Sequence, residues 1–191
     1  MRFSLIDRIL ELEPGRRIRA VKALSLAEEY LSDHFPKFPV LPGVLMLEAL
    51  TESAAWLIRA SEDFAHSIVV LREAKRIRYG QFVEPGQLLY LTAEIVSQDE
   101  RITECKAEGR LEDRLAVSGK IYLERYNLAE RNPDLARVDR SVVKDMRQLF
   151  DVLWPVPARN LSGSAGSVAG ESEGLQNGMS SAAATTSRAE G

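Results

Sequence analysis

The segment from Val44 to Ala60 constrains the fold most strongly, because its apolar residues lie around nearly the whole circumference of a helix. These apolar residues are Val44, Leu45, Met46, Leu47, Ala49, Leu50, Ala54, Ala55, Trp56, Leu57 and Ile58. A helix that is apolar on all sides is normally buried inside a protein. The rest of the chain must therefore cover this helix.

The segments around this helix show the alternation of apolar and polar residues that is typical of β-strands. We expect strands at 17–26, 67–79, 87–97, 102–111 and 115–126. The last three are consecutive and are joined by tight turns, which favours an antiparallel meander. The pattern predicts an α+β fold in which a long curved antiparallel sheet wraps around one buried central helix.

The two ends of the chain are expected to differ from this central part. At the start, residues 4–10 predict a short helix with Ser4 as its N-cap. Near the other end, residues 141–154 have the spacing of an amphipathic helix, which we expect to dock on the domain or on a partner subunit.

A change of composition after Asn160 separates the folded part from a tail. Of the 31 residues from Leu161 to Gly191, 21 are Ser, Gly, Ala or Thr, so this segment is expected to be disordered. We therefore expect three parts, which are a domain at 1–130, a helical extension at 131–160 and a tail at 161–191.

Charge and cysteine content argue against several classes of function. The chain has 25 Lys and Arg against 28 Asp and Glu, a net charge of −3, so neither nucleic acid nor a membrane is an expected partner. Cys105 is the single cysteine, and with only His34 and His66 it forms no zinc-ligand pattern. No apolar run approaches the roughly 18–20 residues that span a bilayer. We expect a cytoplasmic protein without a structural metal or a disulfide.

A narrow polar stripe interrupts the apolar helix. Glu48, Thr51 and Glu52 fall within roughly 100° of one another around the helix axis. Burying an unpaired charge costs several kcal/mol, so such a stripe either lines a functional site or faces solvent or a subunit seam.

The segment before the helix is stiffened by prolines. His34 opens it and the Pro42-Gly43 pair closes it. Gly43 would place free backbone N–H groups at the positive end of the helix dipole, where they can polarise a carbonyl. Read without further context, His34 is either a catalytic imidazole or a loop packing residue, and Gly43 serves either the chemistry or only the turn.

Together these residues form a pattern that closely resembles the signature of one enzyme family. The pattern is His34-Phe35-Pro36-x-x-Pro39-Val40-x-Pro42-Gly43-Val44-Leu45-x-x-Glu48-Ala49. It is similar to that of the 3-hydroxyacyl-(acyl-carrier-protein) dehydratases of fatty-acid synthesis, which have the hotdog fold. The resemblance extends over about residues 4–126 and includes Pro85-Gly86 before the long strands.

The resemblance implies a mechanism and a set of site residues. It makes His34 the base that removes the Cα proton, Glu48 the acid that protonates the leaving hydroxyl, and Gly43 the N–H donor to the thioester carbonyl. The residues expected to contact the substrate are Phe35, Val44, Glu52, Trp56, Tyr79 and Phe82. No cofactor is expected.

The resemblance also implies partners. In the family each site combines residues from the two subunits of a dimer, so the monomer is expected to be inactive, and dimers often assemble further into trimers of dimers. The substrate is presented by an acidic acyl carrier protein. A basic cluster suited to that protein is expected at Lys75, Arg76 and Arg78, with a second choice at 16–19.

One departure from the family pattern leaves an alternative open. Relatives commonly carry Gln where this chain has Glu52, and two carboxyl groups four residues apart in a buried site should raise one pKa. Glu52 either keeps Glu48 protonated and ready to act as an acid, or it disturbs the acid–base chemistry of the site so that the protein is a weak or inactive enzyme. The alternative function is therefore a non-catalytic hotdog subunit that binds acyl chains or pairs with an active dehydratase. A hotdog thioesterase fits the pattern less well.

Overall fold

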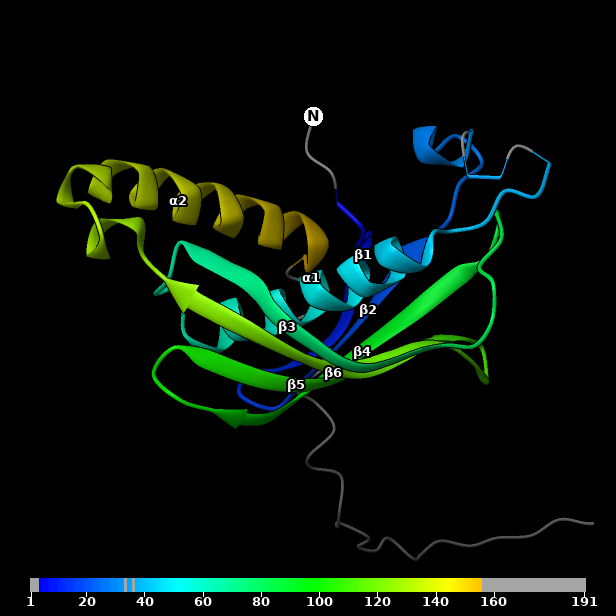
Figure 1. Ribbon diagram of the computed structural model, residues 1–191. Coiled ribbons are helices and arrows are strands. Elements are labelled where there is room, and N and C mark those ends of the chain that lie inside the picture. Colours follow the sequence, from blue (N-terminus) through cyan, green and yellow to red (C-terminus); the bar gives the residue numbers. More distant parts are fainter. Residues whose placement is uncertain (1–3, 33, 36, 156–191) are drawn as a thin grey trace, which may run out of the picture.

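The computed structural model describes residues 4–32, 34, 35 and 37–155 (Figure 1). The tail predicted at 161–191 lies outside these residues. Within them the elements alternate from strands to one long helix, back to strands, and then to a second long helix.

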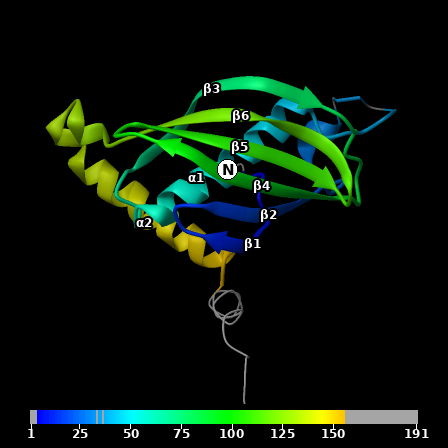
Figure 2. The ribbon, with the colours of Figure 1, turned by 90° about the horizontal axis from the view of Figure 1, so that it is seen from below.

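Six strands form one antiparallel sheet. They are β1 (Arg8–Glu13), β2 (Arg17–Ala23), β3 (Ile68–Tyr79), β4 (Leu88–Gln98), β5 (Ile102–Leu111) and β6 (Arg114–Tyr126). Their spatial order is β1-β2-β4-β5-β6-β3, and Figure 2 shows β1 and β3 at the two edges. The meander predicted for the last three long strands is confirmed, because β4, β5 and β6 pair in sequence.

Helix α1 (Gly43–Ser61) fills the curve of the sheet, as Figure 1 shows. It packs against β2, β3, β4, β5 and β6. The side chains of Leu50, Leu57 and Ile58 have no solvent exposure, and full burial of such a side chain contributes about 1.5–3 kcal/mol. This is the predicted α+β hotdog arrangement, with the sheet wrapped around one central helix.

The helix predicted at 4–10 is wrong, because Arg8–Glu13 form strand β1. Ile9 and Leu12 are both buried although they are three residues apart, a spacing typical of a helix. The pairing of β1 with β2 shifts register between Ile9 and Glu11. Such a β-bulge adds one residue and breaks the alternation of the strand, so the bulge accounts for the helical pattern.

Among the described residues, three short 3₁₀ turns precede the second long helix. They are η1 (Glu29–Leu31), η2 (Leu128–Glu130) and η3 (Pro133–Leu135). The carboxylate of Asp139 accepts hydrogen bonds from the backbone N–H groups of Leu128 and Ala129, both at 2.9 Å, and from the hydroxyl of Ser67. Asp139 thereby ties the start of the last helix to the start of β3.

Helix α2 (Ala136–Leu153) begins earlier than the helix predicted at 141–154 and packs on its own domain. Phe150 is buried, with its ring centroid 6.0 Å from that of Trp56 and 5.4 Å from that of Phe64. In Figure 1, α2 lies on the side of α1 that faces away from the sheet. Neither α1 nor α2 is long and apolar enough to cross a membrane, nor is any shorter helix among the described residues.

The aromatic contact of Phe150 predicts how firmly α2 is held. We expect Phe150→Ala to lower the free energy of unfolding by roughly 3 kcal/mol, because the substitution leaves a cavity among buried rings. Val152→Ala is the matched control, since Val152 is exposed on the same helix. Urea denaturation measures both, and equal losses for the two variants would contradict the docking of α2 through Phe150.

Candidate functional site

Five of the predicted site residues share one cavity. His34, Phe35, Gly43, Tyr79 and Phe82 line a space of about 250 Å³ at the start of the helix. The loop brings His34 to this place, and the end of β3 supplies Tyr79. The ring centroids of His34 and Phe35 are 4.4 Å apart. An imidazole and the first turn of a long helix therefore face the same cavity.

Gly43 is the first residue of α1 and follows the N-cap Pro42. The first N–H groups of a helix have no acceptor within the helix and lie at its positive end. A Cβ atom at position 43 would lie 3.1 Å from Cε1 of Tyr79. The close ring of Tyr79 thus favours glycine here, and Gly43 itself lines the cavity.

Glu48, Glu52 and Trp56 line a second cavity, of about 510 Å³. Five residues separate Glu48 from Gly43, which turns the side chain about 140° around the helix axis. His34 does not line this second cavity, so one chain does not bring His34 and Glu48 into the same space. Val44 lines neither cavity and is 70% exposed.

The polar stripe of α1 is divided between solvent and protein. Glu48 is exposed, Glu52 is partly buried and Thr51 is buried, with its hydroxyl donating to the carbonyl of Leu47 at 3.0 Å. Oε2 of Glu52 accepts a hydrogen bond of 2.8 Å from the backbone N–H of Leu5. Glu48 therefore reaches solvent, and all three residues line the cavity. That the stripe lines a functional site stays a prediction.

Glu52 is the carboxyl group with the raised pKa. Burial raises the pKa of Glu52 to about 7, the hydrogen bond from Leu5 opposes this rise, and the nearby charge of Glu48 adds to it. The prediction that one carboxyl pKa would rise is confirmed. Its principal cause, however, is burial rather than the second carboxylate.

Several residues of the second cavity were not predicted, among them Arg59, Met146 and Leu149. Arg59 lies on the same face of α1 as Glu52, and Met146 and Leu149 come from α2. The spacing of seven residues from Glu52 to Arg59 continues the polar stripe, so the sequence did contain a signal for Arg59. Nothing in the pattern of α2 indicated which surface it would cover.

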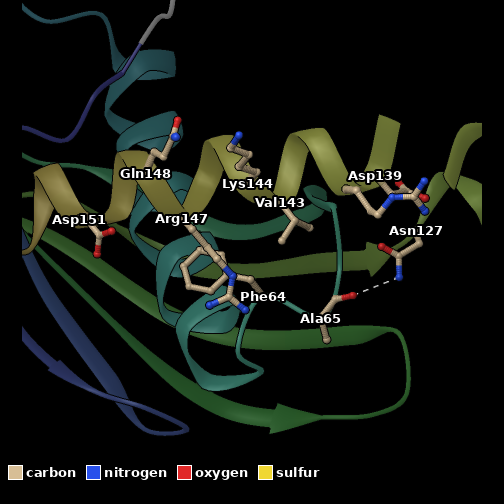
Figure 3. A pocket seen from close by; sticks show the side chains of 10 residues that line it. Phe64, Ala65, Asn127, Asp139, Val143, Lys144, Arg147, Gln148 and Asp151 are labelled. Atoms are coloured by element: carbon tan, nitrogen blue, oxygen red, sulfur yellow. Dashed lines mark hydrogen bonds between the residues drawn. The ribbon is translucent and has the colours of Figure 1, made fainter. Parts of the chain in front are cut away.

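A further cavity, of about 570 Å³, lies between α2 and the turn after α1 (Figure 3). Arg147 crosses it, donates to Oδ1 of Asp63 at 2.9 Å and lies 4.7 Å from the centre of the Phe64 ring. None of the predicted site residues lines this space. Because Arg147 is already engaged, we do not assign the catalytic site to this cavity.

Comparison with known proteins adds evidence independent of this geometry. Residues 1–120 match the family model described as a FabA-like domain. A 3-hydroxyacyl-(acyl-carrier-protein) dehydratase FabZ from Ruminiclostridium cellulolyticum is 34% identical over 119 residues, which cover 62% of this chain and 84% of the relative. The enzyme of the same name from Dechloromonas aromatica is 37% identical over 129 residues, covering 66% and 90%.

The fold also has a counterpart among solved structures. The dehydratase heterocomplex ApeI:P from Xenorhabdus doucetiae is similar with a TM-score of 0.57 and 16% identity, covering 70% of this chain and 90% of that chain. At this identity the likeness supports the fold alone.

The raised pKa of Glu52 predicts a pH-dependent stability. The folded state holds the Glu52 proton up to about pH 7 and the unfolded state only up to about 4.5, so stability from this group is lost as the pH rises through that window. We expect Glu52→Gln to raise the free energy of unfolding by about 2 kcal/mol at pH 8.5 and to change it little below pH 4.5.

Urea denaturation across this pH range tests the expectation. The matched control is Glu94→Gln, at an exposed carboxylate on β4, which should change stability by less than about 0.5 kcal/mol throughout. A Glu52→Gln effect of the same size at every pH would contradict the raised pKa.

Proposed function

The chain belongs to the FabA-like family, and we propose that it is a dehydratase that removes water from 3-hydroxyacyl thioesters carried by acyl carrier protein. The observation that carries this proposal is the cavity in which His34 faces the first turn of α1 at Gly43. Its curated relatives are named for the same reaction. The product is the trans-2-enoyl thioester, which a fatty-acid pathway consumes.

The proposed reaction needs a base, an acid and a stabilised carbonyl. His34 removes a proton from Cα, and the electrons move toward the thioester carbonyl, whose developing negative charge accepts a hydrogen bond from the N–H of Gly43. Glu48 donates a proton to the hydroxyl at C3, which leaves as water while the Cα–Cβ double bond forms. The two proton transfers, from Cα to His34 and from Glu48 to the leaving hydroxyl, complete the elimination, and the step uses no cofactor.

A dimer would complete the site, because His34 and Glu48 face different cavities in one chain. β3 is an edge strand, and an unpaired edge is a template for a strand from another chain. Tyr79 and Phe82, at and just after its end, are 52% and 63% exposed, which also favours a subunit interface. We propose that a second copy pairs here and supplies Glu48 to the His34 of its partner. Assembly of such dimers into trimers stays a prediction.

The basic residues suited to an acidic carrier protein are those of β3. Arg76 and Arg78 are exposed and form no ion pair with other described residues, whereas Lys75 pairs with Glu73 at 2.8 Å. The three arginines at 16–19 all pair with Glu11 or Glu13. Free positive charge therefore favours the β3 cluster as the docking surface. A cytoplasmic location, where such a carrier would be met, stays a prediction.

Substitution of the two proposed catalytic side chains tests the reaction. We expect His34→Ala and Glu48→Gln each to lower kcat by roughly 10²- to 10⁴-fold, because each removes one proton transfer. The measurement is hydration of a crotonyl thioester on carrier protein and on coenzyme A, with Glu94→Gln as the control. A wild-type dimer that is folded but inactive on both would indicate the non-catalytic acyl-binding subunit instead.

Mixing the two inactive variants tests whether the site is shared. If each site takes His34 from one subunit and Glu48 from the other, a mixed dimer holds one intact site, and random mixing restores about a quarter of the activity. The subunits are unfolded together, refolded and assayed. If both residues act within one chain, every subunit carries a lesion and the mixture stays inactive.

A further inference from the structure

The cavity beside Glu48 runs along one face of α1 as far as the basic residue Arg59. Glu48, Glu52 and Arg59 follow one another on this face at spacings of four and seven residues. The opposite walls are apolar and come from Val69 and Leu71 on one side and from α2 on the other. A chain of methylene groups fits such walls, but the polar residue at the far end needs a separate explanation.

The guanidinium of Arg59 has unused hydrogen-bonding capacity. Its Nε is shielded from solvent and has no hydrogen-bond partner, and its side chain forms no ion pair with another described residue. The guanidinium carbon lies 5.7 Å from the centre of the Trp56 ring, which holds it at the cavity wall. A buried donor left unpaired costs about 1–3 kcal/mol, so such a group in a native protein calls for a specific explanation, such as a functional role.

Glu52 does not supply the missing partner. Its Oε2 is held by the N–H of Leu5, and no contact of ion-pair length joins it to Arg59. Burial lowers the pKa of Arg59 to about 10, and the charge of Glu52 opposes that fall, so Arg59 remains positively charged at neutral pH. With a pKa of about 7, Glu52 can stay protonated when another negative charge enters the cavity.

We propose that this cavity accepts 3-hydroxyacyl chains that end in a carboxylate, which the guanidinium of Arg59 binds. The inference rests on the proposed function, because Glu48 then marks the position of C3. Eleven residues from Glu48 to Arg59 correspond to about 16 Å along the helix axis. The Arg59 side chain reaches back over the Trp56 ring toward the helix N-terminus and covers part of this distance. The remaining gap suits an acyl chain of about ten carbons. The planar guanidinium matches a carboxylate through two parallel hydrogen bonds.

The test compares two substrates of equal length. One is a ten-carbon 3-hydroxyacyl thioester ending in a carboxylate, and the other ends in a methyl group. We expect the wild type to favour the carboxylate by roughly tenfold to a hundredfold in kcat/KM, and Arg59→Met to abolish or reverse this ratio. Arg137→Met is the matched control, since Arg137 is exposed on α2 away from this cavity, and the wild-type ratio should persist in it.

Two further substrates, together with the result for Arg59→Met, separate the possible failures. A methyl ester at the chain end shows whether charge is needed, and selectivity for the ester equal to that for the carboxylate would overturn the choice of a carboxylate. An unchanged ratio in Arg59→Met, with that variant folded, would overturn the role of Arg59. Wild-type turnover of a 3-hydroxybutyryl thioester, which is too short to reach Arg59, reports on the proposed function alone.

Binding is measured by calorimetry with the saturated ten-carbon thioester that ends in a carboxylate. Binding weakened tenfold or more in Arg59→Met supports the carboxylate site even if the wild type turns over no substrate. Equal binding by the wild type and Arg59→Met overturns it.

Discussion

The packing of α1 into the curve of the sheet determines most of what this protein can do. Leu50, Leu57 and Ile58 are fully buried in the core that α1 shares with the sheet, and this burial fixes the rotation of the helix about its axis. The stripe from Glu48 to Arg59 is then turned toward the β3 edge of the sheet, where residues of β3 and α2 line the cavity beside it. A cavity with charged groups inside a largely apolar wall is therefore a direct result of how one helix meets one sheet.

The same rotation explains why a single chain holds only half of the proposed chemistry. The start of α1 opens toward His34, whereas Glu48 projects to a different side of the helix. Bringing Glu48 and the start of α1 to the same side would require the helix to deform and to lose its contacts with five strands. A second chain can supply Glu48 without any deformation of α1, because an edge strand and exposed aromatic rings already lie beside the His34 cavity.

The central helix and the five later strands followed from sequence pattern, because apolar periodicity reports burial directly. The predicted residues of the two cavities came instead from the resemblance to a known family. The first strand did not, because the bulge after Ile9 gives a strand the spacing of a helix. The docking of α2 was also beyond prediction, since an amphipathic pattern identifies an apolar face but not its partner. Arg59 was missed because it lies two turns beyond Glu52, outside the polar stripe formed by Glu48, Thr51 and Glu52.

Because of its buried position, the thiol of Cys105 can report how often the native sheet opens. This thiol lies on β5 within the sheet, has no solvent exposure, and burial raises its pKa to about 12. The native thiol is thus both inaccessible and almost fully protonated, so it reacts slowly with alkylating reagents. Because Cys105 is the single cysteine of the chain, the rate of its alkylation measures how often the centre of the sheet separates from α1.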